Sequence, residues 1–179
     1  MIVSLDEKFQ RIRRIQHEDV KSLMAWDNDP DLFHLTGKKF QHDDDGPSWW
    51  KRLVSDRSRV MFAIMDDRGR LIGDVELLHI LWRAREAELR ISIGDKGQWD
   101  QGFGTQALLE TLVVAFEVMA LHRVYLRVRK DNCRAVCSYE KVGFRLIGRL
   151  EPTGRLKGQQ ALHLMEVTSV HYFPVSLRA

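Results

Sequence analysis

The stretch Trp99-Asp100-Gln101-Gly102-Phe103-Gly104-Thr105 is a glycine-containing turn between a predicted strand and a predicted helix. Before it, residues 87–93 alternate between apolar and polar side chains, which is typical of a β-strand. After it, apolar residues recur at helical spacing, at Leu108, Leu109, Leu112, Phe116 and Met119. Glycines let another molecule approach the main chain, and the free N–H groups at the start of a helix bind phosphate. The pattern therefore predicts either a phosphate-binding turn or a tight turn without a ligand.

A second informative stretch follows this helix. Residues 123–129 alternate again, and residues 131–144 read as a short helix that ends in glycine. Together, the glycine turn and the pattern Asn-x-x-Ala-x-x-x-Tyr-Glu-Lys-x-Gly-Phe over residues 132–144 resemble the GNAT superfamily of acetyl-coenzyme-A-dependent N-acetyltransferases. The details look most like its RimJ/RimL-type branch. Trp99 departs from the resemblance, because the superfamily usually has Gln or Arg at this position.

The resemblance implies a fold. It is an α/β fold (α+β mixed), with a central mixed, mostly antiparallel sheet, a splayed pair of parallel strands and about four flanking helices. The expected order along the chain is β-α-α-β-β-β-α-β-α-β-β. We expect one domain over residues 1–179, with a variable acceptor-side part (1–58) and a core that holds the coenzyme site (59–167).

The individual elements are predicted from local patterns. A strand over 9–15 and a helix from His17 to near Asn28 are followed by an irregular stretch over 31–46. An acidic run and a proline then start a helix that carries Trp49 and Trp50. A hairpin of residues 59–65 and 71–81 comes next, and the last strands are expected over 145–150 and 160–167.

Composition narrows the class of protein. A chain of 179 residues with 44% hydrophobic and 30% charged residues suits one soluble domain. The net charge of +3 is mild and dispersed, which argues against nucleic-acid binding, and neither a membrane span nor a secretion signal is evident. Cys133 and Cys137 are expected to be reduced, partly buried thiols of a cytoplasmic protein. The histidines show no metal-ligand spacing, so no metal is expected.

Tyr139 is the candidate proton donor for the leaving thiolate of coenzyme A. Asn132, Ala135 and Tyr139 share one face of their helix, where a small alanine leaves room for the pantetheine arm and the asparagine offers an amide. Tyr139 could instead pack under Phe144 as an ordinary contact at the helix end, if Gly143 is the left-handed residue there. The complete motif favours the catalytic interpretation.

Glu88 is the first candidate for the base that takes a proton from the amine. It is expected to point away from the core, opposite to Leu89, and the resemblance supports a glutamate on this strand. The alternative is a solvated strand residue paired with Arg90 or another neighbour. Glu76 ranks second and His34 third, because an imidazole titrates near neutral pH.

Two further sets of residues complete the expected site. The resemblance implies that acetyl-CoA, as co-substrate, is bound by the strand, the glycine turn and the second motif, through Ile91, Ser92, Ile93, Trp99, Gln101, Gly102, Phe103, Gly104, Thr105, Asn132 and Ala135. The acceptor is expected to meet residues of the variable part and one strand, drawn from Trp26, Phe33, His34, Trp50 and Glu76.

The predicted function is acetyl transfer from acetyl-CoA to a primary amine by direct attack in a ternary complex. Candidate acceptors are a protein N-terminus, a polyamine, an amino sugar or a similar small molecule. The alternatives are a coenzyme-binding module without catalysis, which Trp99 favours, and a transferase of a larger acyl group. A monomer or a homodimer is expected.

Overall fold

A seven-stranded mixed sheet forms the centre of the protein, in the order β1-β2-β3-β4-β5-β7-β6. The computed structural model describes residues 9–36, 46–151 and 161–172. All neighbouring strands pair antiparallel except β4 and β5, which are parallel, so the predicted mixed α/β sheet is confirmed. The strands are β1 (Ile12–Arg14), β2 (Val60–Met65), β3 (Leu71–Leu81), β4 (Glu86–Ile93), β5 (Arg123–Arg129), β6 (Arg145–Leu150) and β7 (Leu162–Thr168).

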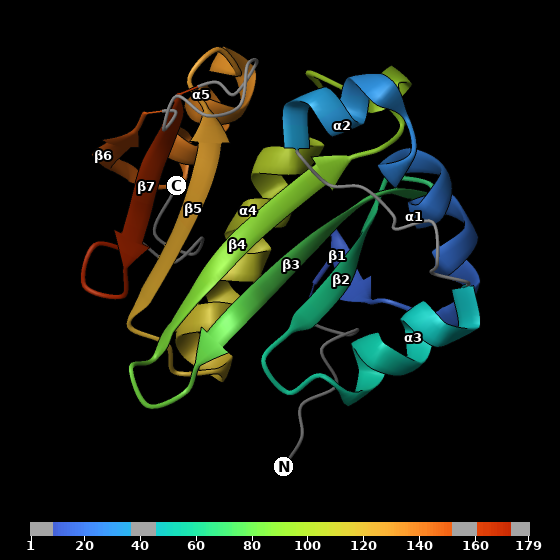
Figure 1. The fold of residues 1–179 in the computed structure, drawn as a ribbon, viewed down its shortest axis with the longest axis horizontal. Helices are drawn as coiled ribbons and strands as arrows, with labels where there is room; N and C mark the ends of the chain where they lie inside the picture. The colour runs from blue at the N-terminus through green and yellow to red at the C-terminus, as the bar shows by residue number, and fades with distance from the viewer. Residues whose placement is uncertain (1–8, 37–45, 152–160, 173–179) are drawn as a thin grey trace.

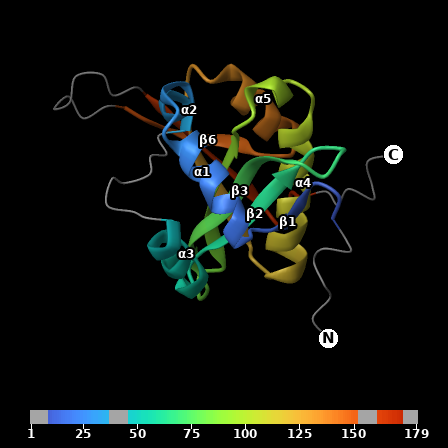
Figure 2. The ribbon, with the colours of Figure 1, turned by 90° about the vertical axis from the view of Figure 1, so that its right-hand side faces the viewer.

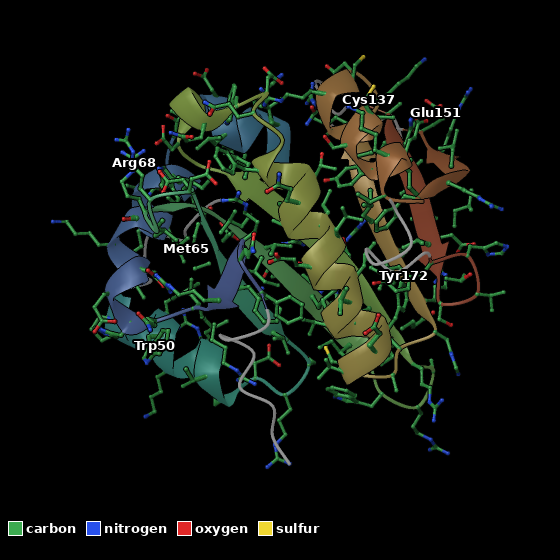
Figure 3. The ribbon with its side chains drawn as sticks, turned by 180° about the vertical axis from the view of Figure 1, so that it is seen from behind. Trp50, Met65, Arg68, Cys137, Glu151 and Tyr172 are labelled. Carbon is green, nitrogen blue, oxygen red and sulfur yellow. The ribbon has the colours of Figure 1, made fainter. Side chains whose placement is uncertain are left out.

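Helices cover both faces of this sheet (Figures 1 and 2). They are α1 (Val20–Asp27), α2 (Pro30–Thr36), α3 (Gly46–Ser55), α4 (Phe103–Val113) and α5 (Cys133–Lys141), and a π-helical turn (Val114–Val118) extends α4. Helix α4 lies along one face, in front of the sheet when the molecule is seen from behind, whereas α1 and α3 lie on the other side (Figures 2 and 3).

The main core lies between α4 and the sheet. Leu108 and Leu112 of α4 are fully buried together with Leu89 of β4 and with Val124 and Leu126 of β5. Successive residues of a strand point to opposite faces of the sheet, so the alternation seen in the sequence separates the residues of each strand into two faces. The even-numbered positions of β4 and the odd-numbered positions of β5 therefore face away from α4, and most of them are polar or charged.

The parallel pair separates soon after it begins. Pairing runs through three positions and ends at Glu88 opposite Tyr125, although β4 continues to Ile93 and β5 to Arg129. The two strands are adjacent at their starts and diverge toward their carboxyl ends, where α2 and α5 lie (Figure 1). The predicted splayed strand pair is thus present. Its open edges leave main-chain groups of β4 able to bind another molecule.

One predicted element was wrong. Residues 30–36 were expected to be mostly irregular, but they form the helix α2. Pro30 begins this helix, a position where proline is tolerated because its missing N–H would have no partner in the helix. The carboxylate of Asp29 accepts hydrogen bonds from the N–H groups of Asp31 (2.9 Å) and Leu32 (3.2 Å), which caps the helix start. A seven-residue helix is too short to show a clear hydrophobic period.

The remaining differences are small. The first strand is limited to Ile12–Arg14, and the described residues form five α-helices where about four were expected. Both cysteines are exposed rather than partly buried. Cys137 lies on α5 (Figure 3). The acidic run at 43–45 and the loop at 153–158 lie outside the described residues. Over the described ranges, no helix is long and apolar enough to cross a membrane, and no cluster of potential metal ligands occurs.

We expect Gly73→Ala to destabilise the protein severely. A Cβ at Gly73 would stand directly against the main-chain oxygen of Ser92 on the neighbouring strand, and backbone cannot yield as a side chain can. Overpacking of this kind costs about 3 kcal/mol. Urea unfolding measures the loss. Gly148→Ala is the matched control, since its Cβ would meet Leu164 only at 3.9 Å, and equal stability of the two variants would contradict the expectation.

Candidate active site

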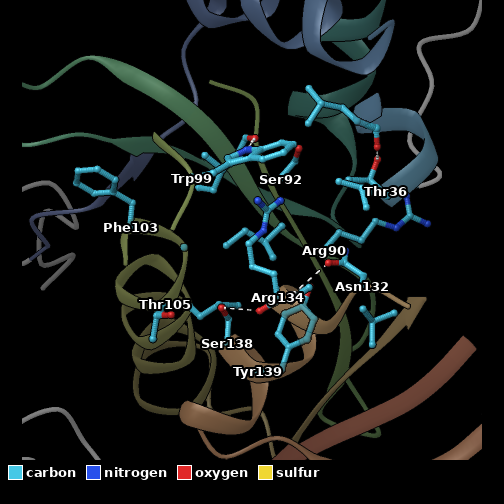
Figure 4. Close-up of a pocket in the computed structure, with 18 of the residues that line it drawn as sticks. Thr36, Arg90, Ser92, Trp99, Phe103, Thr105, Asn132, Arg134, Ser138 and Tyr139 are labelled. Carbon is cyan, nitrogen blue, oxygen red and sulfur yellow. Dashed lines mark hydrogen bonds between the residues drawn. The ribbon is translucent and has the colours of Figure 1, made fainter. Parts of the chain in front are cut away.

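A cavity opens where β4 and β5 separate, between the glycine turn, α4, α5 and the end of α2 (Figure 4). It brings together residues from both sequence motifs. Of the eleven residues predicted to bind the coenzyme, ten line it: Ile91, Ser92, Ile93, Trp99, Gly102, Phe103, Gly104, Thr105, Asn132 and Ala135. Gln101 does not. Its amide donates instead to the main-chain oxygen of Gly97 at 2.8 Å.

The glycine turn is open at the start of α4. Gly102 is the residue that precedes the helix and has the left-handed φ of 86°, which glycine adopts without strain. No side chain among the described residues caps this helix start, so its first N–H groups have no side-chain partner there, and Gly102, Phe103 and Gly104 line the cavity. Gly104 has ordinary dihedral angles, and a Cβ there would lie 3.7 Å from Ile93. Its lack of a side chain keeps space clear for a ligand.

Trp99 has a structural role that the sequence did not reveal. Its indole N–H donates to the main-chain oxygen of Ile93 at 2.8 Å, which holds the turn against the end of β4. The guanidinium carbon of Arg134 lies 3.8 Å from the centre of the indole ring, in a cation–π contact (Figure 4). Asp100 points outward, with 73% of its side chain exposed, and lies 3.8 Å from Arg134. A cation from α5 therefore stands beside the turn.

Tyr139 lines the cavity and also makes the packing contact with Phe144 that the sequence predicted as the alternative to a catalytic role. Its ring packs edge-on against Phe144, with 5.7 Å between ring centres, and Gly143 has the left-handed φ of 103°. The side chain also lines the cavity (Figure 4). Burial raises the pKa of Tyr139 well above that of a free tyrosine, so the hydroxyl keeps its proton at neutral pH.

Glu88 is buried in an ion pair and does not line the cavity. Its position on β4 faces away from the main core, as expected. The side chain is nevertheless buried, with 3% of the residue exposed. Arg127 donates from Nε (3.1 Å) and from one terminal nitrogen (2.9 Å) to Oε1, and the same nitrogen lies 3.0 Å from Oε2. The Nδ1 atom of His79 lies 3.0 Å from Oε2. His79 reaches it from a bulge in β3, where its φ is 52°.

Glu76 is buried beside Glu88 on the same face of the sheet. It is 1% exposed, and its Oε2 lies 3.2 Å from Nε of Arg59. Its Oε1 lies 3.8 Å from a terminal nitrogen of Arg90 but has no hydrogen-bond partner among the described residues. Glu76, too, is not part of the cavity wall.

The other four residues predicted to meet the acceptor also lie off the cavity wall. Trp26 and Trp50 pack against a small second core of Leu23, Leu53 and Met61 between α1, α3 and the sheet. Phe33 and His34 are exposed on the outer side of α2. The inner side of this helix lines the cavity instead, through Leu32, Leu35 and Thr36. Aromatic content alone could not tell which side of a short helix faces inward.

Three arginines of the cavity wall were missed from the sequence. Arg90 and Arg127 come from the two diverging strands, and Arg134 comes from α5. Only their positions in the sequence could have indicated that they line the cavity. The first two lie on the polar faces of strands next to the motifs, and Arg134 lies inside the second motif.

A split parallel strand pair that faces an open helix start and a buried tyrosine defines the class: a transferase that binds an acyl-coenzyme A. The family comparison agrees, because residues 11–145 match the model of the acetyltransferase (GNAT) domain. The chain belongs to this family. It is an N-acetyltransferase that uses acetyl-CoA as co-substrate.

Several bacterial acetyltransferases are similar to this chain over most of their length. A spermidine N(1)-acetyltransferase of Vibrio cholerae is 24% identical over 160 residues, which is 87% of this chain and 92% of that protein. The Escherichia coli K12 enzyme of the same name is 27% identical over 83% of this chain and 80% of its own length. The acetyltransferase PseH of Campylobacter jejuni is 23% identical over 76% of this chain and 83% of that protein.

Solved structures confirm the fold. The crystal structure of the Vibrio cholerae spermidine N-acetyltransferase in complex with CoA and spermine has a TM-score of 0.81 and 25% identity, covering 90% of this chain and 96% of that one. A dodecameric structure of the same enzyme is also similar, with a TM-score of 0.73 and 24% identity over 88% of this chain and 92% of that one.

Proposed function

We propose that this protein acetylates the primary amine of a small molecule by direct attack within a ternary complex. The observation that carries the proposal is the cavity itself, which joins the open start of α4, the unpaired end of β4 and the buried Tyr139 in one space. Acetyl-CoA fits these residues. Main-chain N–H groups at the helix start suit its pyrophosphate, and the free edge of β4 suits the amides of its pantetheine arm.

Arg134 supports the assignment of the pyrophosphate site. The family usually has a polar or cationic side chain at position 99, and tryptophan cannot supply charge there. The guanidinium stacked on Trp99 brings a cation to the same turn. The departure at Trp99 therefore does not favour the alternative of a binding module without catalysis.

The reaction begins when the amine nitrogen attacks the thioester carbon. We expect main-chain N–H groups of β4 near Ser92, which lines the cavity, to donate to the oxygen as it becomes negative. The C–S bond then breaks, and the sulfur takes a proton from the hydroxyl of Tyr139, which solvent later replaces. The amine must also lose its own proton. Glu88 remains our first candidate for this role, with Glu76 second, and because neither lines the cavity the proton would pass through water.

The identity of the acceptor is a further part of the proposal. A polyamine is a candidate, because some relatives are named as spermidine acetyltransferases. The similarity to PseH, whose name does not mention spermidine, leaves other acceptors possible. A RimJ/RimL-type branch, one domain with its acceptor side in residues 1–58, a cytoplasmic location, and a monomer or homodimer all remain predictions. A screen of amines with acetyl-CoA, followed by the release of free thiol, tests the function. Absence of release with every amine would leave the binding module as the better hypothesis.

We expect Gly104→Val to weaken acetyl-CoA binding strongly. The protein itself has room, because the nearest atom to a Cβ is 3.7 Å away, so the variant should fold. The branched side chain would project into the space of the phosphates and remove main-chain hydrogen bonds to an anion, each worth about 1.5–3 kcal/mol. Calorimetric titration of the folded variant measures the affinity. Unchanged affinity would overturn the pyrophosphate assignment.

A further inference from the structure

The acceptor side of the cavity is built from charged residues whose arrangement indicates what they bind. Parallel pairing ends at Glu88 and Tyr125, and Arg90 and Arg127 are each two residues further along their strands. They therefore lie on the same face of the sheet and oppose each other across the split. Both line the cavity, together with the apolar inner side of α2. This face points away from α4, whose start is proposed to hold the coenzyme phosphates.

The carboxylates of this region are already paired and lie beneath the surface. The side chains of Glu76 and Glu88 are 1% and 4% exposed, whereas those of Arg90 and Arg127 are 37% and 43% exposed. Asp100 is the only acidic residue among the described residues of the cavity wall, and it turns outward. Within the described part of the cavity wall, an entering molecule therefore meets guanidinium groups rather than carboxylates.

These guanidinium groups keep unused donors. Arg127 donates from Nε and one terminal nitrogen to Glu88. Its other terminal nitrogen makes no hydrogen bond to any described residue. Arg90 makes only the 3.8 Å contact with Glu76, and no hydrogen bond from its guanidinium reaches the described part of the chain. Arginine forks suit the oxygens of a carboxylate or a phosphate, and a cationic chain placed beside them would be repelled.

Resting on the function proposed above, we infer that the acceptor is an amine that also carries an oxyanion, bound by Arg90 and Arg127 at the split. A carboxylate or a phosphate would satisfy the same donors. The anionic group, held there, places the amine over the unpaired end of β4, where the acetyl group is expected. A polyamine, which carries positive charge along its length, is disfavoured.

The test uses matched acceptors that differ in one anionic group. The pairs are O-phosphoethanolamine with ethanolamine, and alanine with alaninamide, and spermidine is assayed beside them. We expect the anionic member of at least one pair to have a kcat/KM that is about 10- to 100-fold higher, as two charge-assisted hydrogen bonds would supply. The phosphate and carboxylate pairs show which oxyanion is preferred.

The arginines are tested by substitution. Arg90→Gln and Arg127→Gln should each reduce the preference for the anionic member about tenfold, mainly through KM. Arg83→Gln, an exposed residue away from the cavity, has the same change of charge and should keep the preference. Higher kcat/KM for spermidine than for every anionic amine, or a preference unchanged in both variants, overturns the inference while the proposed function stands. Binding of acetyl-CoA without thiol release from any amine would instead overturn the proposed function, and the inference with it.

Discussion

Tyr139→Phe is expected to fold, to bind acetyl-CoA normally and to turn over about 100-fold more slowly than the wild type. Phenylalanine keeps the ring, its place on α5 and its edge-on contact with Phe144. Only the hydroxyl is lost, and with it the proton for the leaving thiolate. A free thiol has a pKa of about 8.5, so a thiolate is a tolerable leaving group, and the loss should shrink for acyl donors with a more acidic thiol.

Steady-state rates and melting temperatures of the two proteins separate the possible roles of Tyr139. Tyr125→Phe is a suitable control, because Tyr125 lies on β5 outside the cavity wall. Equal rates for wild type and Tyr139→Phe would make Tyr139 a packing residue only and would favour the binding module without catalysis.

The raised pKa of Tyr139 also predicts how stability depends on pH. A phenol whose pKa is higher in the folded than in the unfolded protein contributes stability that is fully present below the unfolded value, about 10. That contribution is lost as the pH rises above this value, because the unfolded chain releases the proton first. The melting temperature of the wild type should therefore fall more steeply above about pH 10 than that of Tyr139→Phe. Parallel curves would contradict this.

Glu88→Gln is expected to reduce turnover by about 10²–10⁴ and to leave the affinity for acetyl-CoA unchanged. Glutamine keeps the shape of the side chain and can still accept from Arg127, but it cannot take a proton from the amine. The loss should be largest at low pH, where the amine remains protonated and most needs a base. Rates measured between about pH 6 and 9 give the profile.

The structure supplies a control for this experiment. Glu86 lies on the same strand and face as Glu88, but at the start of the parallel pairing rather than at the split, and it is paired with Arg123. Glu86→Gln should therefore turn over at nearly the wild-type rate. Should Glu88→Gln match the wild type throughout the pH range, the base lies elsewhere, and Glu76, whose Oε1 lacks a hydrogen-bond partner among the described residues, is the next candidate to test.

The sequence alone determined the elements that we propose bind the coenzyme. The glycine turn and the helix after it are contiguous in the chain, and so is the motif around Tyr139. Local rules of periodicity, left-handed glycines and helix starts therefore apply to them directly. Ten of the eleven residues predicted from these stretches and from the strand before the turn line one cavity. The contact of Tyr139 with Phe144 follows from the glycine at the end of α5.

Only the tertiary structure decided which side chains line the rest of the cavity and which residues pair with the buried charges. Glu88 is buried in an ion pair with Arg127 because β5 runs beside β4 as far as this position. The extent of that pairing cannot be predicted from a local sequence pattern. Trp26, a candidate for the acceptor site, packs in a second core, where its ring lies directly against Gly94, which has no side chain. On α2, Leu32 rather than Phe33 is buried. Side chains from distant segments meet here, and long-range packing rather than local propensity sets which of them face the cavity.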